Sequence, residues 1–234
     1  MLVGEVSVLT RHPVKSMLGE VLDHVEVAER GLVGDRSWAA YTPDGGIGSG
    51  KTTRRFRRVD GLLQCRAVLD EQPEPWLVLP PGTGHRAGTA ATDEALSGFL
   101  GRPVQLRRES DVPHHDEAPV HLLTTGSVAE LGRQLGRPVD ARRFRANILI
   151  ETATPPGFVE DDWVGRELAI GDTVVLALGA GMPRCVMVDA PRPDVGPQPP
   201  VLKVVAEVHA LRLGLQASVR RPGTVRSEDV ARLL

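Results

Sequence analysis

The chain has 234 residues, with 28 Lys and Arg against 30 Asp and Glu, 41% hydrophobic residues and 3% aromatic residues. This length suits one large domain or two small ones, and the hydrophobic content is typical of a folded globular protein. The formal charge of -2 gives the whole molecule no electrostatic attraction to nucleic acid, and the few aromatic residues leave few stacking platforms for bases. We therefore expect no nucleic acid among its partners.

The start of the chain, MLVGEVSVLTRHPVKS, lacks the basic residues and long apolar run of a signal peptide. The sequence also has no stretch that approaches the roughly 20 apolar residues of a membrane helix. We therefore expect a cytoplasmic protein with no membrane partner. Cys65 and Cys185 lie far apart and form no Cys-x-x-Cys motif, which argues against a disulfide framework and against a zinc site made by protein alone. Cys65 lies in an apolar run and is expected in the core.

Short apolar or alternating runs, separated by Gly, Pro and Asp, predict strands along most of the chain. The runs are GEVSVLT (4–10), VLDHVEVA (21–28), RSWAAYT (36–42), WLVLP (76–80), PVQLRR (103–108), ANILIE (146–151), RELAIG (166–171) and TVVLALG (173–179). Helices are predicted at 92–99, at 127–136 with a capping box of Ser127 and Glu130, and at 200–211. The fold class is therefore strand-rich α/β with a barrel-like sheet. The break at 81–92 predicts a boundary between two modules, and the Pro-rich stretch 190–200 an ordered loop.

The stretch GGIGSGKT (45–52) fits the Gly-x4-Gly-Lys-Thr pattern of a phosphate-binding P-loop. Its flanks disagree, because a P-loop follows a buried strand and opens a helix. Here a Pro-Asp-Gly turn precedes it, and the basic run that follows leaves no apolar face for a helix. The favoured interpretation is a hairpin followed by a solvated basic strand. A more specific alternative is that some of the cations line an anion pocket while the others meet solvent. The cations are Lys51, Arg54, Arg55, Arg57 and Arg58.

Cys185 follows an apolar strand and stands beside Arg184, whose charge favours the thiolate of a nucleophile or of a soft-metal ligand. An inert structural cysteine is the other interpretation. Arg145 directly precedes a predicted buried strand, where an arginine usually has an anionic partner. The stretch HHDE (114–117) is interpreted as a loop rather than a metal site.

The order of several motifs resembles that of the MOSC family, the domain at the C-terminus of molybdenum-cofactor sulfurases and in amidoxime-reducing components. The motifs are HPVKS (12–16), RGLVGDRSW (30–38), RFRANILIE (143–151), EDDWVGRELAIGD (160–172), PRCVM (183–187) and LGLQASVRRPGTVRSED (213–229). The resemblance implies an N-terminal β-barrel-like region over residues 1–90 and a MOSC β-barrel module with few helices over 91–234.

The resemblance also implies a molybdenum cofactor, molybdopterin, in which the pterin dithiolene supplies two sulfurs and Cys185 a protein ligand to the metal. It implies further positions that hold the pterin and its phosphate by charge and by hydrogen bonds. These positions are Lys15, Ser16, Arg36, Arg54, Arg55, Thr124, Ser127, Arg145, Asn147 and Arg184. Thr124 and Ser127 occupy a strand-to-helix turn, where a helix N-terminus assists anion binding.

The function that the resemblance implies is reduction of small N-hydroxylated compounds by oxygen-atom transfer. The chain has no Rossmann fingerprint, haem motif or cysteine cluster, so electrons are expected from a separate flavin or iron-sulfur protein. Val186 and Met187 follow the cysteine where many family members have Thr-Thr, which indicates a different substrate pocket. Two alternatives stay open: a sulfur-carrier or cofactor-handling protein that uses Cys185, and a P-loop nucleotide-binding protein.

Overall fold

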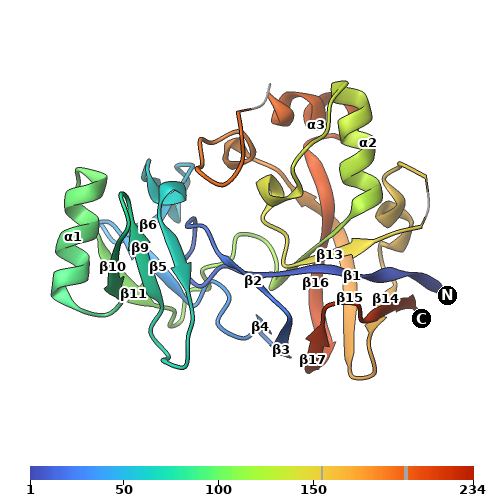
Figure 1. Ribbon diagram of the computed structural model, residues 1–234, viewed down its shortest axis with the longest axis horizontal. Coiled ribbons are helices and arrows are strands. Elements are labelled where there is room, and N and C mark those ends of the chain that lie inside the picture. The colour runs from blue at the N-terminus through green and yellow to red at the C-terminus, as the bar shows by residue number, and fades with distance from the viewer. Residues whose placement is uncertain (154, 198–199) are drawn as a thin grey trace.

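The structure is a computed structural model that describes residues 1–153, 155–197 and 200–234. It has an elongated outline, with α1 at one end and both termini at the other (Figure 1). Positions 198 and 199 of the loop predicted at 190–200 lie outside the described residues.

The largest sheet has the strand order β13-β12-β16-β15-β14-β18-β1-β2. An additional pairing of β1 with β13 closes seven of the described strands into a barrel, so the first strand of the chain completes a structure made mostly by its second half. The pairs are antiparallel except for β12 with β13. The strands are β1 (Leu2–Arg11), β2 (Glu20–Leu22), β12 (Val120–Thr124), β13 (Ile148–Glu151), β14 (Glu167–Ile170), β15 (Val174–Pro183), β16 (Arg212–Arg221) and β18 (Val230–Leu233).

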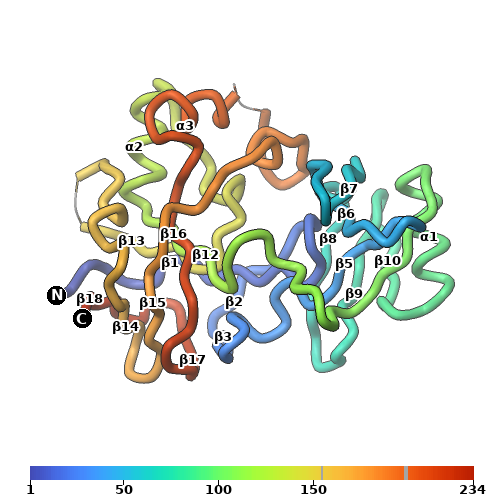
Figure 2. Tube along the Cα trace, turned by 180° about the vertical axis from the view of Figure 1, so that it is seen from behind, coloured from blue at the N-terminus to red at the C-terminus, as the bar shows by residue number. Residues whose placement is uncertain are grey.

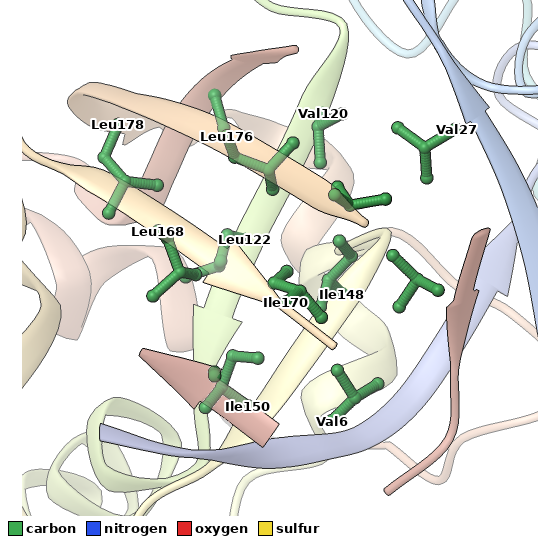
Figure 3. Packing of buried hydrophobic residues seen from close by; sticks show 14 of the residues in the cluster. Val6, Val27, Val120, Leu122, Ile148, Ile150, Leu168, Ile170, Leu176 and Leu178 are labelled. Carbon is green, nitrogen blue, oxygen red and sulfur yellow. The ribbon is translucent and has the colours of Figure 1, made fainter. Parts of the chain in front are cut away.

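The barrel interior is filled by branched apolar side chains from facing strands (Figure 3), among them Leu122, Ile148 and Leu176. Side chains of a regular strand alternate between its two faces, so Val6 and Leu9, three positions apart, would point to opposite faces. A register shift between Val6 and Val8 in the pairing with β13 changes this alternation. Both Val6 and Leu9 are consequently buried in the same core.

The N-terminal half forms smaller sheets at the other end of the molecule (Figure 2). Val14, Trp38, Leu77, Leu96 and Leu106 belong to a second core between these sheets and α1 (Ala90–Leu100). The sheet strands are β5 (Trp38–Tyr41), β6 (Ile47–Ser49), β7 (Phe56–Arg58) and β11 (Gln105–Arg108), then β8 (Arg66–Val68), β9 (Trp76–Leu79) and β10 (Thr83–Arg86), with the 3-10 helix η1 (Leu62–Gln64).

The division predicted at residue 90 stays a prediction about modules, but the hydrophobic packing crosses that position in both directions. Before it, β1 completes the barrel; beyond it, α1 and β11 pack with the second core. A third small sheet, β17-β3-β4, joins the two halves of the sequence, because β17 (Gly223–Arg226) pairs with β3 (His24–Ala28), which pairs with β4 (Gly31–Leu32).

All three predicted helices are found, and two of them, α1 and the middle helix, begin two residues earlier than their sequence signals indicate. The middle helix, α2, covers Thr125–Leu135 and is capped by Thr124, whose hydroxyl accepts a hydrogen bond from the Ser127 backbone nitrogen. The predicted capping box of Ser127 and Glu130 is therefore wrong. The Ser127 hydroxyl instead donates to Glu160, while Glu130 pairs with Arg133. The last helix, α3, covers Val201–His209 and packs with α2 over Leu123 and Leu213 of the barrel.

The segment that resembles a P-loop has the predicted hairpin geometry. Tyr41 of β5 pairs with Ile47 of β6, and the chain after residue 52 enters the basic strand β7 rather than a helix. Without a helix N-terminus after the glycines, the described segment lacks the arrangement that holds nucleotide phosphates in a P-loop. Cys65 is fully buried, as predicted, and burial raises the pKa of its thiol to about 12.

Candidate functional site

The segment between β1 and β2 carries the first part of the site, because it runs between the two cores. Its Val14 and Met17 side chains pack into the second core. The backbone nitrogen of Lys15 donates to the Trp38 carbonyl oxygen at 2.8 Å. The Leu18 nitrogen likewise donates to the Cys65 carbonyl oxygen at 2.9 Å. These contacts hold Lys15 with only 2% of its residue surface exposed.

A pocket at this junction brings together seven of the residues that the sequence predicts for cofactor binding. They come from four separate stretches of the chain and line one space, here named the Cys185 pocket: Lys15, Ser16, Arg36, Arg145, Asn147, Arg184 and Cys185. Ser49, Lys51, Asp116 and His121 also line it. The structure therefore forms a cation-rich pocket around one thiol.

Three of the pocket residues have a backbone conformation that side-chain-bearing residues rarely adopt. Ser16, Arg36 and Arg145 have φ angles of 63°, 49° and 54°. This left-handed region is unfavourable for residues other than Gly, Asn and Asp, and such outliers persist mainly where the surroundings enforce them. Three outliers from distant parts of the chain in one pocket indicate that the fold is built to present these side chains.

Asp116 lies between the two lysines of the pocket. Its carboxylate is 3.0 Å from the Lys15 Nζ and 3.5 Å from the Lys51 Nζ, and both cations also stand over the Phe56 ring. Burial lowers the pKa of Lys15 from 10.5 to about 8 despite the attraction of Asp116. The pKa of Asp116 is itself lowered to about 2, because Lys15 and Lys51 outweigh the opposing effect of its burial. The carboxylate thus marks a position where the protein stabilises an anion.

Asn147 organises the opposite wall of the pocket. Its Oδ1 accepts from the His121 backbone nitrogen at 3.1 Å and from the Arg36 guanidinium at 3.4 Å, and its Nδ2 donates to Thr10. Arg36 also donates to the Arg145 carbonyl oxygen at 3.3 Å and forms an ion pair with Asp35. The Asn147 side chain therefore links Arg36 to the backbones of β1 and β12 and so fixes the position of Arg36.

Arg145 is a buried cation without a carboxylate partner among the described residues. Its Nη1 donates to the Met17 carbonyl oxygen at 2.6 Å, whereas its Nη2 has no hydrogen-bond partner in the described part of the chain. Burial, with the repulsion of Arg36 and Arg192, lowers the pKa of Arg145 to about 9, so the group stays charged at neutral pH. An unpartnered buried guanidinium is costly and favours binding of an anion.

Cys185 lies at the end of β15, immediately before the 3-10 helix η4 (Val186–Val188), and its side chain is partly exposed. The neighbouring Arg184 donates to the Phe144 carbonyl oxygen at 2.8 Å, and its Nη1 lies 3.4 Å from the His121 Nε2. Arg143, on the 3-10 helix η2 (Ala141–Phe144), donates to the Val188 carbonyl oxygen and so anchors η4. The thiol is held at the edge of the pocket rather than in a core.

Four predicted residues lie outside this pocket. The Thr124 and Ser127 hydroxyls both donate to the Glu160 carboxyl group, on the 3-10 helix η3 (Val159–Trp163), at 2.6 Å, and burial raises the pKa of Glu160. Arg54 and Arg55 line a separate surface pocket. Arg55 also donates to the carbonyl oxygen of His115 at 2.6 Å and so supports the segment that carries Asp116.

Sequence reasoning gave no specific role to Asp116, which it assigned to a loop, or to His121. Both come from residues between α1 and α2 that carry no recognised motif, and only the fold brings them to the cysteine. Lys51 is one of five cations of which an unspecified subset was considered as the lining of an anion pocket. It lines this pocket, whereas Arg57 and Arg58 pair with Asp44 and Asp60 near the surface. The described residues contain no cluster of three or more His, Cys, Asp or Glu side chains able to hold a metal ion.

The chain is thus a closed β-barrel joined to a second β region, with a pocket of buried cations around a thiol at the junction. Residues 109–232 match the MOSC domain, and residues 3–73 match the MOSC N-terminal beta barrel domain. The chain therefore belongs to the MOSC-domain family.

Curated relatives agree with this assignment, and one solved structure shares the fold. Mitochondrial amidoxime reducing component 2 from Bos taurus is 28% identical over 235 residues, covering 83% of this chain and 68% of that protein. Molybdenum cofactor sulfurase from Oryza sativa subsp. japonica is 26% identical over 236 residues, covering 76% of this chain and 27% of that protein. The crystal structure of the YUAD protein from Bacillus subtilis shares the fold, with a TM-score of 0.53, 14% identity, and coverage of 98% of this chain and 94% of that one.

The names of the two curated relatives refer to amidoxime reduction and to the molybdenum cofactor, so the family is associated with that cofactor. In the part of the chain that the structure describes, none of the helices has the length and apolar character needed to cross a membrane.

Proposed function

We propose that the protein binds the molybdenum cofactor in the Cys185 pocket and reduces N-hydroxylated small molecules with it. The single observation that carries this proposal is the convergence of Cys185 with buried, incompletely partnered cations in one pocket. The relatives' names support the choice of cofactor and substrate class.

The chemistry of the pocket residues fits a pterin cofactor that carries a phosphate and a dithiolene. Lys15, Arg36 and Arg145 supply positive charge for the phosphate, and the unpartnered Arg184 Nε supplies a hydrogen-bond donor. Cys185 supplies a single soft ligand, which suffices for a metal that the dithiolene already holds. The donor set therefore matches the two ends of such a molecule.

The room in the pocket depends on the position of Asp116. The cavity measures about 90 Å³, below the roughly 300 Å³ at which ligand pockets usually begin. A neighbouring cavity of about 570 Å³ shares Ser16 and Met187 with it. Displacement of Asp116 by an anionic cofactor would free the lysines and join more of this space, so we infer that cofactor binding moves the segment that carries Asp116.

When bound, the cofactor supplies two-electron oxygen-atom transfer, which none of the twenty side chains provides. The chain's own residues bind and orient it. Arg36 and Asn147 would form part of the wall that holds the pterin, and Arg143 anchors η4 next to Cys185, which lines the pocket and would supply the metal ligand. Electrons come from a separate flavin or iron-sulfur protein, and the exposed Val186 beside Cys185 contributes to the substrate side of the site.

The test is molybdenum and pterin content together with benzamidoxime reduction, measured on protein from a cofactor-competent host. Cys185→Ala is expected to keep the circular dichroism spectrum and melting temperature of the wild type but to lose benzamidoxime reduction. The control Lys203→Ala, at an exposed position, is expected to keep both the fold and the activity. Reduction that persists in Cys185→Ala would refute the proposal.

A sulfur-carrier or cofactor-handling role for Cys185 is the second candidate, favoured by its partial exposure beside a cation. Mass spectrometry that finds one added sulfur atom on Cys185, in protein that reduces no N-hydroxylated compound, would support this role instead.

A further inference from the structure

Arg145 lines the Cys185 pocket and also a second cavity of about 410 Å³. This second space, here named the His12 cavity, lies against the outside of β1 and β13. Its apolar walls include Val8, Leu123 and Leu149. Its volume lies within the roughly 300–1,000 Å³ that small-molecule sites occupy.

His12 is the most unusual residue of this cavity. It is 3% exposed, and neither of its ring nitrogens has a hydrogen-bond partner among residues 1–153, 155–197 and 200–234. The backbone of His12 is held by two hydrogen bonds. Its backbone nitrogen donates to the Asp35 Oδ1 at 2.7 Å, and its carbonyl oxygen accepts from the Arg36 backbone nitrogen at 2.7 Å. Buried imidazoles normally have partners, so a ring held in place without one indicates a missing ligand.

One positive charge at the cavity is uncompensated. Arg142, Arg145 and Arg192 all line the cavity, but Arg142 pairs with Asp140 and Arg192 with Asp194. The two lining carboxylates are already engaged, since Glu20 pairs with Arg11 at 2.9 Å and Asp194 pairs with Arg192 at 2.6 Å. Arg145 retains an unpartnered Nη2 within the described residues. A buried positive charge without a carboxylate partner beside an unpartnered imidazole forms a built site for an acceptor group.

The charge available selects the class of anion. Burial and the neighbouring arginines lower the pKa of His12 well below its usual value, so the ring is neutral and offers one N–H donor. The Arg145 Nη2 offers two more N–H bonds and the single uncompensated positive charge. One positive charge matches the single negative charge of a carboxylate, whereas a phosphate group carries about two negative charges at neutral pH. The apolar walls suit a hydrocarbon body.

We propose that the His12 cavity is a second ligand site, which binds a carboxylic acid with an apolar body through the His12 ring and the Arg145 guanidinium. This site is separate from the cysteine, and the proposal does not rest on the reductase activity. Because Arg145 lines both spaces, a ligand here contacts the wall of the Cys185 pocket.

Isothermal titration calorimetry of the full chain with benzoate, and separately with inorganic phosphate, tests the proposal. Benzoate is expected to bind, and His12→Phe, which keeps the ring volume but removes the nitrogens, to weaken binding about tenfold or more. The matched control His24→Phe replaces an exposed histidine of β3 and is expected to bind benzoate as the parent does.

A second variant guards against misfolding of His12→Phe. Val21 lines the cavity but is 70% exposed, so Val21→Glu adds a negative charge there with little effect on the fold and is expected to weaken benzoate binding. The proposal is overturned if the parent protein does not bind benzoate, or if phosphate binds as tightly and His12→Phe weakens its binding to the same extent. It is also overturned if benzoate affinity falls in Lys15→Ala but not in His12→Phe, because the anion would then lie in the Cys185 pocket.

Discussion

Replacement of Lys15 by methionine tests whether the buried cation is kept for binding rather than for stability. Burial lowers the pKa of Lys15 from 10.5 to about 8 even with Asp116 at 3.0 Å. At about 1.4 kcal/mol per pKa unit, this lowering corresponds to about 3 kcal/mol by which the folded state disfavours the charged lysine. The contact of Lys15 with the Phe56 ring offsets roughly 0.5–2 kcal/mol of it.

We therefore expect Lys15→Met to raise the free energy of unfolding of cofactor-free protein by about 1–2.5 kcal/mol at pH 7. The sign follows from proton binding: below pH 8 the lysine is charged in both states, and the folded state bears the cost. As pH rises from about 8 toward 10.5, folded Lys15 loses its proton first, so the wild type recovers stability and the advantage of methionine shrinks.

Urea unfolding at pH 7 and at pH 9.5 measures both effects, with Lys203→Met as the control because Lys203 is 74% exposed on α3. Lys15→Met should also contain less molybdenum and pterin than the wild type, since the cofactor phosphate would lose a buried cation. A Lys15→Met protein that is less stable than the wild type at pH 7 would refute the reasoning, because the lysine charge would then be a net stabilising feature of the fold.

Four further predictions concern other residues. Asp116→Asn should increase pterin content when cofactor is limiting, because it removes the carboxylate that competes for Lys15 and Lys51; unchanged or lower content contradicts the inferred displacement. In the wild type, acid unfolding should show the stabilising contribution of Asp116 intact above about pH 4 and lost toward pH 2, since the folded-state pKa is lowered from 3.8 to about 2. Leu122→Ala, in the barrel core, should destabilise the protein by about 2–5 kcal/mol in urea unfolding, whereas Val21→Ala at an exposed position should change it little. Magnesium-ATP should show no tight binding by calorimetry to the wild type, and Lys51→Ala should leave this unchanged; tight binding lost on that substitution would restore the nucleotide-binding alternative.

The local sequence determined most of the strands and the existence of the helices. Alternating runs such as RELAIG specify a strand with one buried face, and β14 forms where that run lies. Turn chemistry before GGIGSGKT likewise excluded a P-loop, because backbone preferences act over a few residues and do not depend on the rest of the fold. The α2 cap was predicted wrongly, since Thr124 and Ser127 are both capping residues and the choice between them depends on Glu160, which is distant in sequence.

The motif order was also enough to identify the family, which the domain matches show. It also picked out seven residues that line the Cys185 pocket together. Only the tertiary structure revealed that Asp116 occupies the lysines, that β1 closes the barrel, and that His12 is buried without a partner. Each of these facts is a relation between segments far apart in the chain. Whether a buried charge is paired depends on which distant groups the fold brings within a few ångströms, and no local pattern of residues encodes that distance.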